Sequence, residues 1–332
     1  MEKEIDFLAV GDITIDAFIK LKESAEAKCD IDEKNCKLCL PLGDKVPFEE
    51  ADVVNAVGNS PNASVSAARL GLSSYLLANV GNDENGKSCI KALEENNVHA
   101  EYVGVQEGLP TNYHYVLWLP PERTILVKQV PFTYHIPKDM PVPKWMYLSS
   151  MGQSSEAFHA EIADYLKTHP ETKLAFQPGT FQMKMGIEKL KEIYTHTTLF
   201  FVNVEEAQRI LSTTERDIKK LCDMIHALGP KYVVITDGPA GAYGSDGTHT
   251  YFMPIYPDPK PPYERTGAGD AFASTFTSAM VLGKSFEEAF TWAPINSMSV
   301  VQYVGAQKGL LSKEQLETYL QNAPEDYKLK EI

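Results

Sequence analysis

The sequence predicts an α/β fold in which a doubly wound, mainly parallel sheet is flanked by helices and joined by a small lid of β-strands. Two observations carry this prediction. Four short apolar runs between residues 145 and 236 alternate with helix-like stretches, as expected of a parallel sheet that is covered on both faces. Nearer the N-terminus, residues 113–130 alternate with period two around a proline turn, which is typical of an antiparallel hairpin.

The elements of the N-terminal part follow from local patterns. An apolar run at residues 5–10 predicts a buried strand, and the looser alternation of 14–22 predicts a half-covered one. Residues 23–50 are polar and punctuated by cysteine and proline, so we expect them to leave the core. The same patterns then predict a helix over 62–70, a strand over 76–80 and a helix over 87–96.

The C-terminal part shows the strand–helix alternation itself. After the hairpin of 113–119 and 123–130, the apolar runs predict strands at 145–150, 173–177, 199–202 and 232–236. Helical spacing of apolar residues predicts helices at 155–168, 184–195, 204–211, 215–228, 269–282, 285–303 and 312–321. We expect one domain over residues 1–332, with lid strands drawn from about 13–58 and 98–130.

Composition and charge exclude several classes of protein. The 332 residues are 43% hydrophobic and 23% charged, which is typical of a globular protein rather than a disordered one. A net charge of −14 argues against nucleic acid as a partner, although a few local groups can still hold a small phosphate ligand. No apolar run approaches the roughly 20 residues of a membrane helix. With no signal peptide visible at the start, we expect a cytoplasmic protein.

The clearest chemical signal is the segment Arg265-Thr-Gly-Ala-Gly-Asp-Ala-Phe272. Small residues let backbone N–H groups at a helix start approach an anion, and the helix dipole favours negative charge there. Asp270 would repel such an anion, so its presence suggests a general base that deprotonates a hydroxyl attacking phosphorus. The alternative is a glycine-rich turn whose acidic residue only stabilises the first helical turn.

Together with this segment, several others resemble the ribokinase-like (PfkB) family of sugar and nucleoside kinases, in the family's order along nearly the whole chain. The matching segments are Gly11-Asp12-Ile-Thr-Ile-Asp16, Val57-Gly58-Asn59-Ser-Pro-Asn62, Asn79-Val-Gly-Asn-Asp83-Glu-Asn-Gly86, Asn203-Val-Glu-Glu206, Thr236-Asp-Gly238-Pro-Ala-Gly241 and Val304-Gly305-Ala306. The resemblance implies a ribokinase-like fold.

The resemblance also implies roles for individual residues. Asp270 would be the catalytic base, and Gly267, Ala268 and Gly269 would form the anion hole. The acceptor substrate would lie against Asp16, Gly58, Asn59 and Asn62, with Arg123 on the hairpin as a further candidate. ATP would lie along Asn203, Glu206, Thr236, Gly238, Gly241 and Gly305, with Mg²⁺ held through water near Asn203 and Glu206 rather than by a direct protein ligand.

Several of these residues have simpler interpretations. Asn203 and Glu206 fit a helix-capping pattern, and Arg123 fits an exposed arginine. Cys29, Cys36 and Cys39 fit free thiols or a zinc site without an evident fourth ligand. The chain also departs from the family at Val57 and Gln177, and at Glu264-Arg265, where an Asp-Thr pair often helps to hold a monovalent cation.

These observations predict an ATP- and Mg²⁺-dependent kinase that phosphorylates a hydroxyl, expected to be a hydroxymethyl group, of a sugar or sugar-like alcohol. Two alternatives stay open: a nucleoside kinase, and a non-catalytic protein that binds a sugar or nucleotide. A dinucleotide-dependent oxidoreductase fits less well because the first strand ends in Gly-Asp-Ile-Thr rather than in a Gly-x-Gly-x-x-Gly turn. Exposed lid edges make a homodimer plausible.

Overall fold

The computed structural model describes residues 4–22, 26–28, 37–119 and 122–332. In these residues a ten-stranded sheet has the order β16-β15-β14-β13-β12-β11-β10-β1-β6-β7. The seven strands from β13 to β7 are parallel neighbours, as predicted. Their bounds are Phe7–Val10 (β1), Ser74–Gly81 (β6), Val103–Gln106 (β7), Trp145–Leu148 (β10), Lys173–Phe176 (β11), Thr197–Asn203 (β12) and Tyr232–Thr236 (β13).

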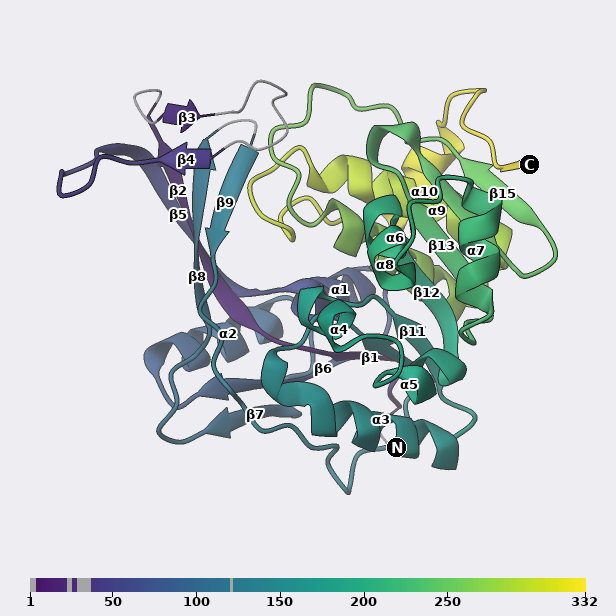
Figure 1. Cartoon of the computed structure of the whole chain (residues 1–332), viewed down its shortest axis with the longest axis horizontal. Helices are drawn as coiled ribbons and strands as arrows, with labels where there is room; N and C mark the ends of the chain where they lie inside the picture. The colour runs from purple at the N-terminus through teal and green to yellow at the C-terminus, as the bar shows by residue number, and fades with distance from the viewer. Residues whose placement is uncertain (1–3, 23–25, 29–36, 120–121) are drawn as a thin grey trace.

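Helices cover both faces of this sheet (Figure 1). One face carries α1 (Asn59–Arg69), α2 (Glu84–Glu95), α8 (Ala268–Val281), α9 (Phe286–Val300) and α10 (Lys313–Gln321). The other carries α3 (Glu156–Thr168), α4 (Thr180–Met185), α5 (Lys191–His196), α6 (Val204–Leu211) and α7 (Ile218–His226). None of the helices in this described part of the chain is long and apolar enough to cross a bilayer.

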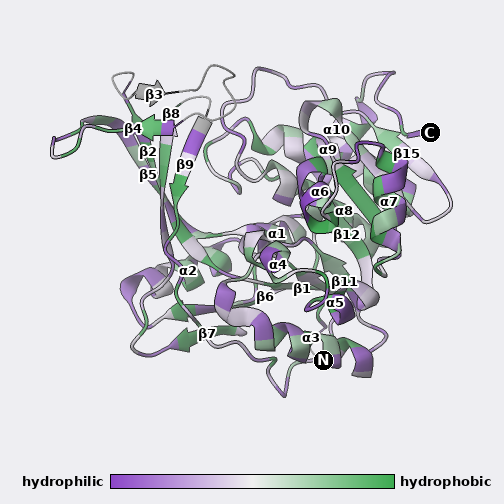
Figure 2. Cartoon of the chain, viewed as in Figure 1, coloured by the Kyte–Doolittle hydropathy of each residue, from purple (hydrophilic) through white to green (hydrophobic). Residues whose placement is uncertain are grey.

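The central strands supply both hydrophobic cores because their side chains alternate. On β1, Phe7 and Ala9 pack into one core, whereas Leu8 and Val10 pack into the other. This explains why the strand reads as a continuous apolar run. The same hydrophobic character is visible in Figure 2 for β12, which is green beside helices with purple stretches. The carboxyl ends of these strands meet at one edge of the sheet, where ligands bind in such folds.

A smaller sheet stands beside the large one, at the left of Figure 1. Its order is β5-β2-β8-β9, with bounds Phe48–Val57 (β5), Thr14–Leu21 (β2), Tyr113–Leu119 (β8) and Glu122–Leu126 (β9). Glu26–Lys28 (β3) and Lys37–Cys39 (β4) form a separate pair. The hairpin of β8 and β9 is the predicted one, although its second strand ends at Leu126 rather than at residue 130.

Two parts of the fold differ from the sequence prediction. The helix predicted over 184–195 is instead α4 and α5, separated at Gly186, whose positive φ of 84° ends α4. The sheet also continues past β13 through three antiparallel strands that were not predicted: Ala242–Ser245 (β14), Thr250–Met253 (β15) and Lys330–Glu331 (β16). The sheet is therefore mixed, and because most of its strands are parallel it agrees with the mainly parallel sheet that was predicted.

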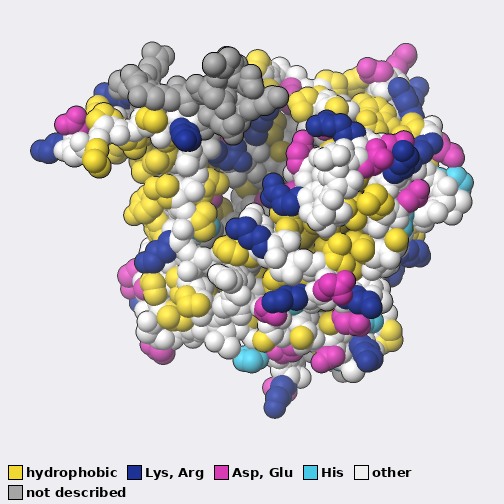
Figure 3. All heavy atoms as spheres, in the orientation of Figure 1, with side chains coloured by type: hydrophobic (Ala, Val, Ile, Leu, Met, Phe, Trp, Pro, Cys, Tyr) yellow, Lys and Arg dark blue, Asp and Glu magenta, His cyan; other side chains and the backbone are white. Residues whose placement is uncertain are grey.

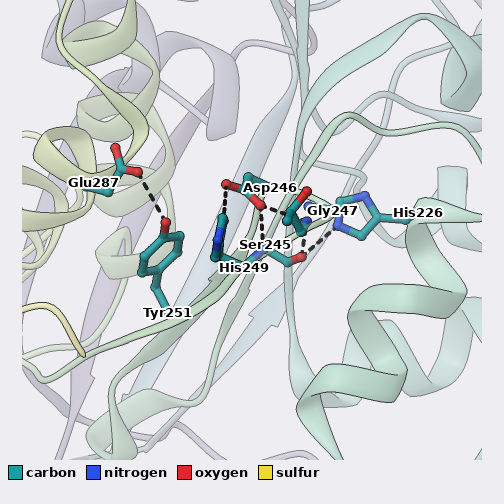
Figure 4. A network of polar contacts seen from close by, with 8 residues as sticks. His226, Ser245, Asp246, Gly247, His249, Tyr251 and Glu287 are labelled. Carbon is teal, nitrogen blue, oxygen red and sulfur yellow. Dashed lines mark hydrogen bonds and ion pairs between the residues drawn. The ribbon is translucent and has the colours of Figure 1, made fainter. Parts of the chain in front are cut away.

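A polar network fastens the turn between β14 and β15 to the neighbouring helices (Figure 4). Ser245 Oγ donates to His226 Nε2 on α7 at 2.9 Å, while His226 Nδ1 donates to the carbonyl of Pro230. Tyr251 donates to Glu287 on α9. These contacts hold the antiparallel edge of the sheet in place.

Candidate active site

Asp270 lies in the first turn of α8, which begins at a glycine turn. Gly267 is the N-cap residue, with a φ of 81° that favours glycine. A Cβ atom at this position would lie 2.3 Å from the Cβ atom of Ala306, so glycine is also required by space. Among the described residues, the N–H of Ala268 approaches the carbonyl oxygen of Arg265 at 3.5 Å, whereas the N–H groups of Gly269 and Asp270 have no backbone acceptor and are available to an anion.

Three side-chain amides surround the carboxylate of Asp270. Asn59 Nδ2 donates to Oδ1 at 2.8 Å, and Asn62 Nδ2 donates to Oδ2 at 2.9 Å. Gln177 Nε2 donates to Oδ1 at 3.3 Å. Burial of the carboxyl group raises the pKa of Asp270, and the three hydrogen bonds oppose that effect by stabilising the charged form.

The amide groups are themselves held in the donating orientation. Gln307 Nε2 donates to Asn62 Oδ1 at 3.0 Å, which leaves the Asn62 nitrogen facing Asp270. Tyr147 on β10 donates its hydroxyl proton to Gln177 Oε1, which turns the nitrogen of Gln177 to the same carboxylate. The sequence marked Gln177 only as a departure and did not mark Tyr147, which lies inside an apolar strand.

Asp16, on β2, and Gly58, directly before α1, belong to a second polar group beside the end of β1. Asp16 Oδ1 is 3.3 Å from His114 Nδ1 on the neighbouring strand β8, and it has no hydrogen-bond partner among the described residues. Gly58 precedes α1, and a Cβ atom there would lie 2.9 Å from the carbonyl oxygen of Asp12. A buried carboxylate oxygen without a partner is suited to accept a hydrogen bond from a hydroxyl.

Asp12 is a further acidic residue of this group, without an assigned role in the sequence prediction. Tyr134 and Gln129 both donate to its carboxylate, one oxygen each. Burial raises the pKa of Asp12, and these two hydrogen bonds oppose the increase. The loop after β9 supplies Gln129, so the chain beyond the hairpin returns to the end of β1.

A cavity of about 410 Å³ opens beside the N-terminal end of α8. Five of the predicted residues line it: Thr236, Gly238, Gly241, Ala268 and Gly269. Apolar side chains make up much of the remaining wall, among them Phe272, Pro294 and Met298, and Arg265 also lines the cavity. An apolar cavity that ends at helix N–H groups fits a ligand with an apolar ring at one end and an anionic group at the other.

Asn203 and Glu206 form the reciprocal capping box that was the simpler interpretation. Asn203 Oδ1 accepts from the backbone N–H of Glu206, and Glu206 Oε2 accepts from that of Asn203. Burial raises the pKa of Glu206, and the negative charge of Asp270 adds to the increase. The capping box uses one oxygen of Glu206, so the residue suits a hydrated Mg²⁺ as well.

Comparison with known proteins identifies the family. The model of the pfkB family of carbohydrate kinases matches residues 28–313. The chain belongs to this family. An ATP-dependent 6-phosphofructokinase from Thermoanaerobacterium thermosaccharolyticum is 26% identical over 322 residues, covering 92% of this chain and 90% of the relative.

Solved structures share the fold of this pfkB-family kinase. A ribokinase from Arabidopsis thaliana, complexed with ribose and ATP, has a TM-score of 0.78 at 21% identity and covers 96% of this chain and 99% of its own. A nucleoside kinase from Methanocaldococcus jannaschii has a TM-score of 0.74 at 17% identity and covers 95% and 98%. The kinase therefore has the ribokinase-like fold that its sequence predicted.

Some predicted site residues of the kinase lie elsewhere. Arg123 is neither free nor fully exposed, because its guanidinium group forms an ion pair with Glu264. Gly305 does not line the cavity. The space beside its Cα atom faces Phe18 and Val54 of the small sheet. Cys29 and Cys36 lie outside the described residues, and Cys39 on β4 is a free thiol.

Proposed function

We propose that this kinase transfers the γ-phosphoryl group of ATP to a hydroxymethyl group of a sugar or sugar-like alcohol. The arrangement around Asp270 carries the proposal: a half-buried carboxylate, fixed by three amide donors, lies in the first turn of α8 beside an apolar cavity. A carboxylate that served only to begin a helix would not require three oriented amides from α1 and the end of β11.

The proposed reaction uses Asp270 as the general base. Its carboxylate takes the proton of the acceptor hydroxyl while the hydroxyl oxygen forms a bond to the γ-phosphorus. The bond from that phosphorus to the bridging oxygen breaks, and ADP leaves with the electron pair. The N–H groups of residues 267–269 stabilise the negative charge on the transferring group.

The acceptor and nucleotide occupy two sides of α8 in this proposal. Asp16, Gly58 and the start of α1 lie on the acceptor side, and the cavity along Thr236 and Gly241 takes ATP. Asn203 and Glu206 would hold Mg²⁺ through water, and the ion when bound would offset the charge of the phosphates. Figure 3 shows Lys and Arg side chains along the hollow between the small sheet and the main body, which suits a phosphate-bearing ligand despite the negative net charge.

A nucleoside is the second candidate acceptor. Trp118 and Tyr134 are buried against other residues, so they are not available to a base. Tyr113 and Tyr115 on β8 form a ring pair at 5.1 Å, but the alternation of side chains along the strand turns both rings to the face opposite His114, which contacts Asp16. This candidate is supported instead by the similarity of the chain to the nucleoside kinase from Methanocaldococcus jannaschii.

A homodimer through the small sheet belongs to the same proposal. Val53, Tyr115, Ile125 and Leu126 expose between 40% and 57% of their surface on its strands. Exposed apolar side chains on one sheet favour association with a second copy. Size-exclusion chromatography with light scattering tests this, because a monomer at all concentrations contradicts it.

The proposed activity is tested by ADP release from Mg-ATP against a panel of sugars, ketoses, sugar phosphates and nucleosides. We expect turnover on a sugar-like member of the panel and a loss of about 10²- to 10⁴-fold in Asp270→Asn, with ATP binding kept. Asp164→Asn, at an exposed site on α3, is the matched control. Equal turnover in Asp270→Asn would exclude Asp270 as the base, and turnover on nucleosides alone would favour the second candidate.

A further inference from the structure

Glu264 is a buried acid in the segment that leads into α8. Only 2% of its side chain is exposed. Its Oε1 atom accepts hydrogen bonds from the backbone N–H and the hydroxyl of Thr266, at 2.8 and 2.5 Å. Thr266 directly precedes Gly267, the N-cap residue of α8. The conformation of the glycine turn therefore depends on where the carboxylate of Glu264 is held.

The cation that accompanies this buried charge comes from the small sheet. Arg123 Nη1 on β9 lies 3.2 Å from Glu264 Oε1. The other oxygen, Oε2, is buried and has no hydrogen-bond partner in the described part of the chain. A buried carboxylate that loses its cation is strongly destabilised, so the position of Glu264 depends on that of Arg123.

Two further contacts join the small sheet to the body at the same place. The ring of Trp118 on β8 meets the ring of Tyr263 edge-on, with centroids 5.1 Å apart. Phe18 and Val54, on β2 and β5, face the space beside Gly305, and the next residue, Ala306, contacts Gly267. The small sheet thus rests on both segments that enclose the glycine turn.

We propose that Arg123 and Glu264 are positioning residues. Through them, the geometry of the anion-binding turn of α8 depends on whether the small sheet is packed against the body of the protein. When the sheet is packed against the body, Arg123 neutralises the charge of Glu264. Glu264 then fixes the position of Thr266, and with it the orientation of the N–H groups of residues 267–269. With the sheet displaced, Glu264 loses its cation and is no longer held at Thr266, and the turn loses its fixed geometry. Phosphoryl transfer is then efficient only when the acceptor is enclosed, which limits transfer to water.

This inference rests on the proposed kinase function, and it replaces direct acceptor binding as the role of Arg123. The two roles predict different kinetics. A residue that positions the turn acts on the transition state, so its loss lowers kcat more than it raises the acceptor KM. A residue that binds the acceptor mainly raises KM, and its effect is independent of Glu264.

The kinetic test compares Arg123→Ala, Glu264→Gln and the double variant. We expect kcat to fall by about 10- to 100-fold in each single variant, as displaced catalytic groups typically cause, with acceptor KM nearly unchanged. The double variant should be no worse than the poorer single one. Lys128→Ala removes an exposed cation from the adjacent segment and should match the wild type. A raised KM in Arg123→Ala with a normal Glu264→Gln would overturn the proposal.

A second readout does not depend on turnover. Amide hydrogen exchange in peptides spanning residues 260–272 should be faster in Arg123→Ala and Glu264→Gln than in the wild type and in Lys128→Ala. Arg123→Lys keeps the positive charge without the planar guanidinium group, so its exchange rate should lie between those of the wild type and Arg123→Ala. It replaces Arg123→Ala if that variant does not fold. Unchanged exchange in both variants would disprove the proposed positioning role of Arg123 and Glu264. Faster exchange in a protein that phosphorylates no acceptor would instead disprove the kinase proposal, and it would still support the dependence of the turn on Arg123 and Glu264.

Discussion

Asn59 and Asp270 lie 211 positions apart in the sequence, yet the Asn59 side chain donates a 2.8 Å hydrogen bond to the Asp270 carboxylate. The bond joins the first turn of α1 to the first turn of α8. Asn62, one turn further along α1, contacts the second oxygen of the same carboxylate. The two helix starts therefore form one polar centre, and the proposed base cannot move without disturbing the side of the site assigned to the acceptor.

The first prediction concerns the pH dependence of activity. Burial raises the pKa of Asp270, and a general base works only when deprotonated, so kcat/KM should fall with decreasing pH at values above those of an ordinary aspartate. Gln177→Leu removes one donor that favours the charged form, so the pKa should rise further and the acidic limb should move to higher pH. Activity near pH 7 should fall about 10-fold or more.

The measurement is the pH profile of kcat/KM for the wild type and Gln177→Leu. Gln208→Leu makes the same chemical change on α6, where the side chain donates a hydrogen bond to the backbone carbonyl of Glu215, and its acidic limb should coincide with that of the wild type. An acidic limb that stays in place or moves to lower pH in Gln177→Leu contradicts the role given to this amide.

The second prediction separates two effects of replacing Gly267: backbone strain from its positive φ, and a steric clash with Ala306. In Gly267→Ala the new Cβ atom would combine a φ of 81° with a distance of 2.3 Å to Ala306. We expect a loss of about 2–5 kcal/mol in the free energy of unfolding and a fall in kcat of more than about 100-fold. Gly283→Ala is the control, because Gly283 has a φ of 82° and its new Cβ atom would have no neighbouring atom within 4 Å in the described part of the chain.

Urea unfolding and steady-state kinetics check this pair. Gly283→Ala should cost about 1–3 kcal/mol, from backbone strain alone, and should keep its kcat. Equal losses of stability in the two variants would show that Ala306 moves aside easily, and a normal kcat in Gly267→Ala would remove the turn from the proposed mechanism.

The third prediction distinguishes the two roles of Glu206. Glutamine at this position can still accept from the N–H of Asn203, so Glu206→Gln should keep the free energy of unfolding within about 0.5 kcal/mol. It loses the negative charge, so the Mg²⁺ concentration for half-maximal activity should rise several-fold. Asn203→Ala should instead lower stability by about 1 kcal/mol. If the Mg²⁺ dependence is unchanged in Glu206→Gln, helix capping alone explains the residue and its role in Mg²⁺ binding is contradicted.

The fourth prediction concerns stability rather than activity. Because burial raises the pKa of Asp12, the folded protein favours its neutral form, and ionisation destabilises the fold as pH rises from the ordinary value toward the raised one. The free energy of unfolding of Asp12→Asn should therefore increase relative to that of the wild type as the pH rises. Urea unfolding at a series of pH values measures this difference.

Asp83 provides a control of opposite sign. Burial alone would raise its pKa, but hydrogen bonds from Thr111 and Gly86 outweigh burial and lower it. The wild type should therefore lose stability relative to Asp83→Asn as pH falls toward the lowered value. Parallel curves for the wild type and Asp12→Asn would show that Asp12 does not contribute to the pH dependence.

The sequence allowed prediction of those features that are local or that lie on apolar strands. The parallel strands read as short apolar runs because both of their faces are buried, and α8 was visible from its glycine turn and its apolar face. The segment with Asn59 and Asn62 was recognised only because it occurs in the family's order. These residues do meet Asp270, although their contact with an acceptor stays a prediction.

The unpredicted parts depend on contacts between distant segments. Gln177 reaches Asp270 across 93 positions, and its orientation depends on Tyr147 from a third segment. Arg123 looked like an exposed arginine because nothing near it in the sequence indicates the buried Glu264. The antiparallel strands β14 and β15 were missed because they are four residues long, and β14, Ala-Tyr-Gly-Ser, includes a glycine and a serine and so lacks a strong apolar pattern.

The short strand β16 has a consequence for how two copies of the chain can meet. Its two residues, Lys330 and Glu331, are both exposed and charged, and they pair with Phe252 and Tyr251 of β15. A short, charged edge offers few free backbone groups and disfavours the addition of a strand from another molecule. Growth of the large sheet from this side into an aggregate is thereby discouraged, which leaves the exposed apolar side chains of the small sheet as the more favourable place for a second copy to bind.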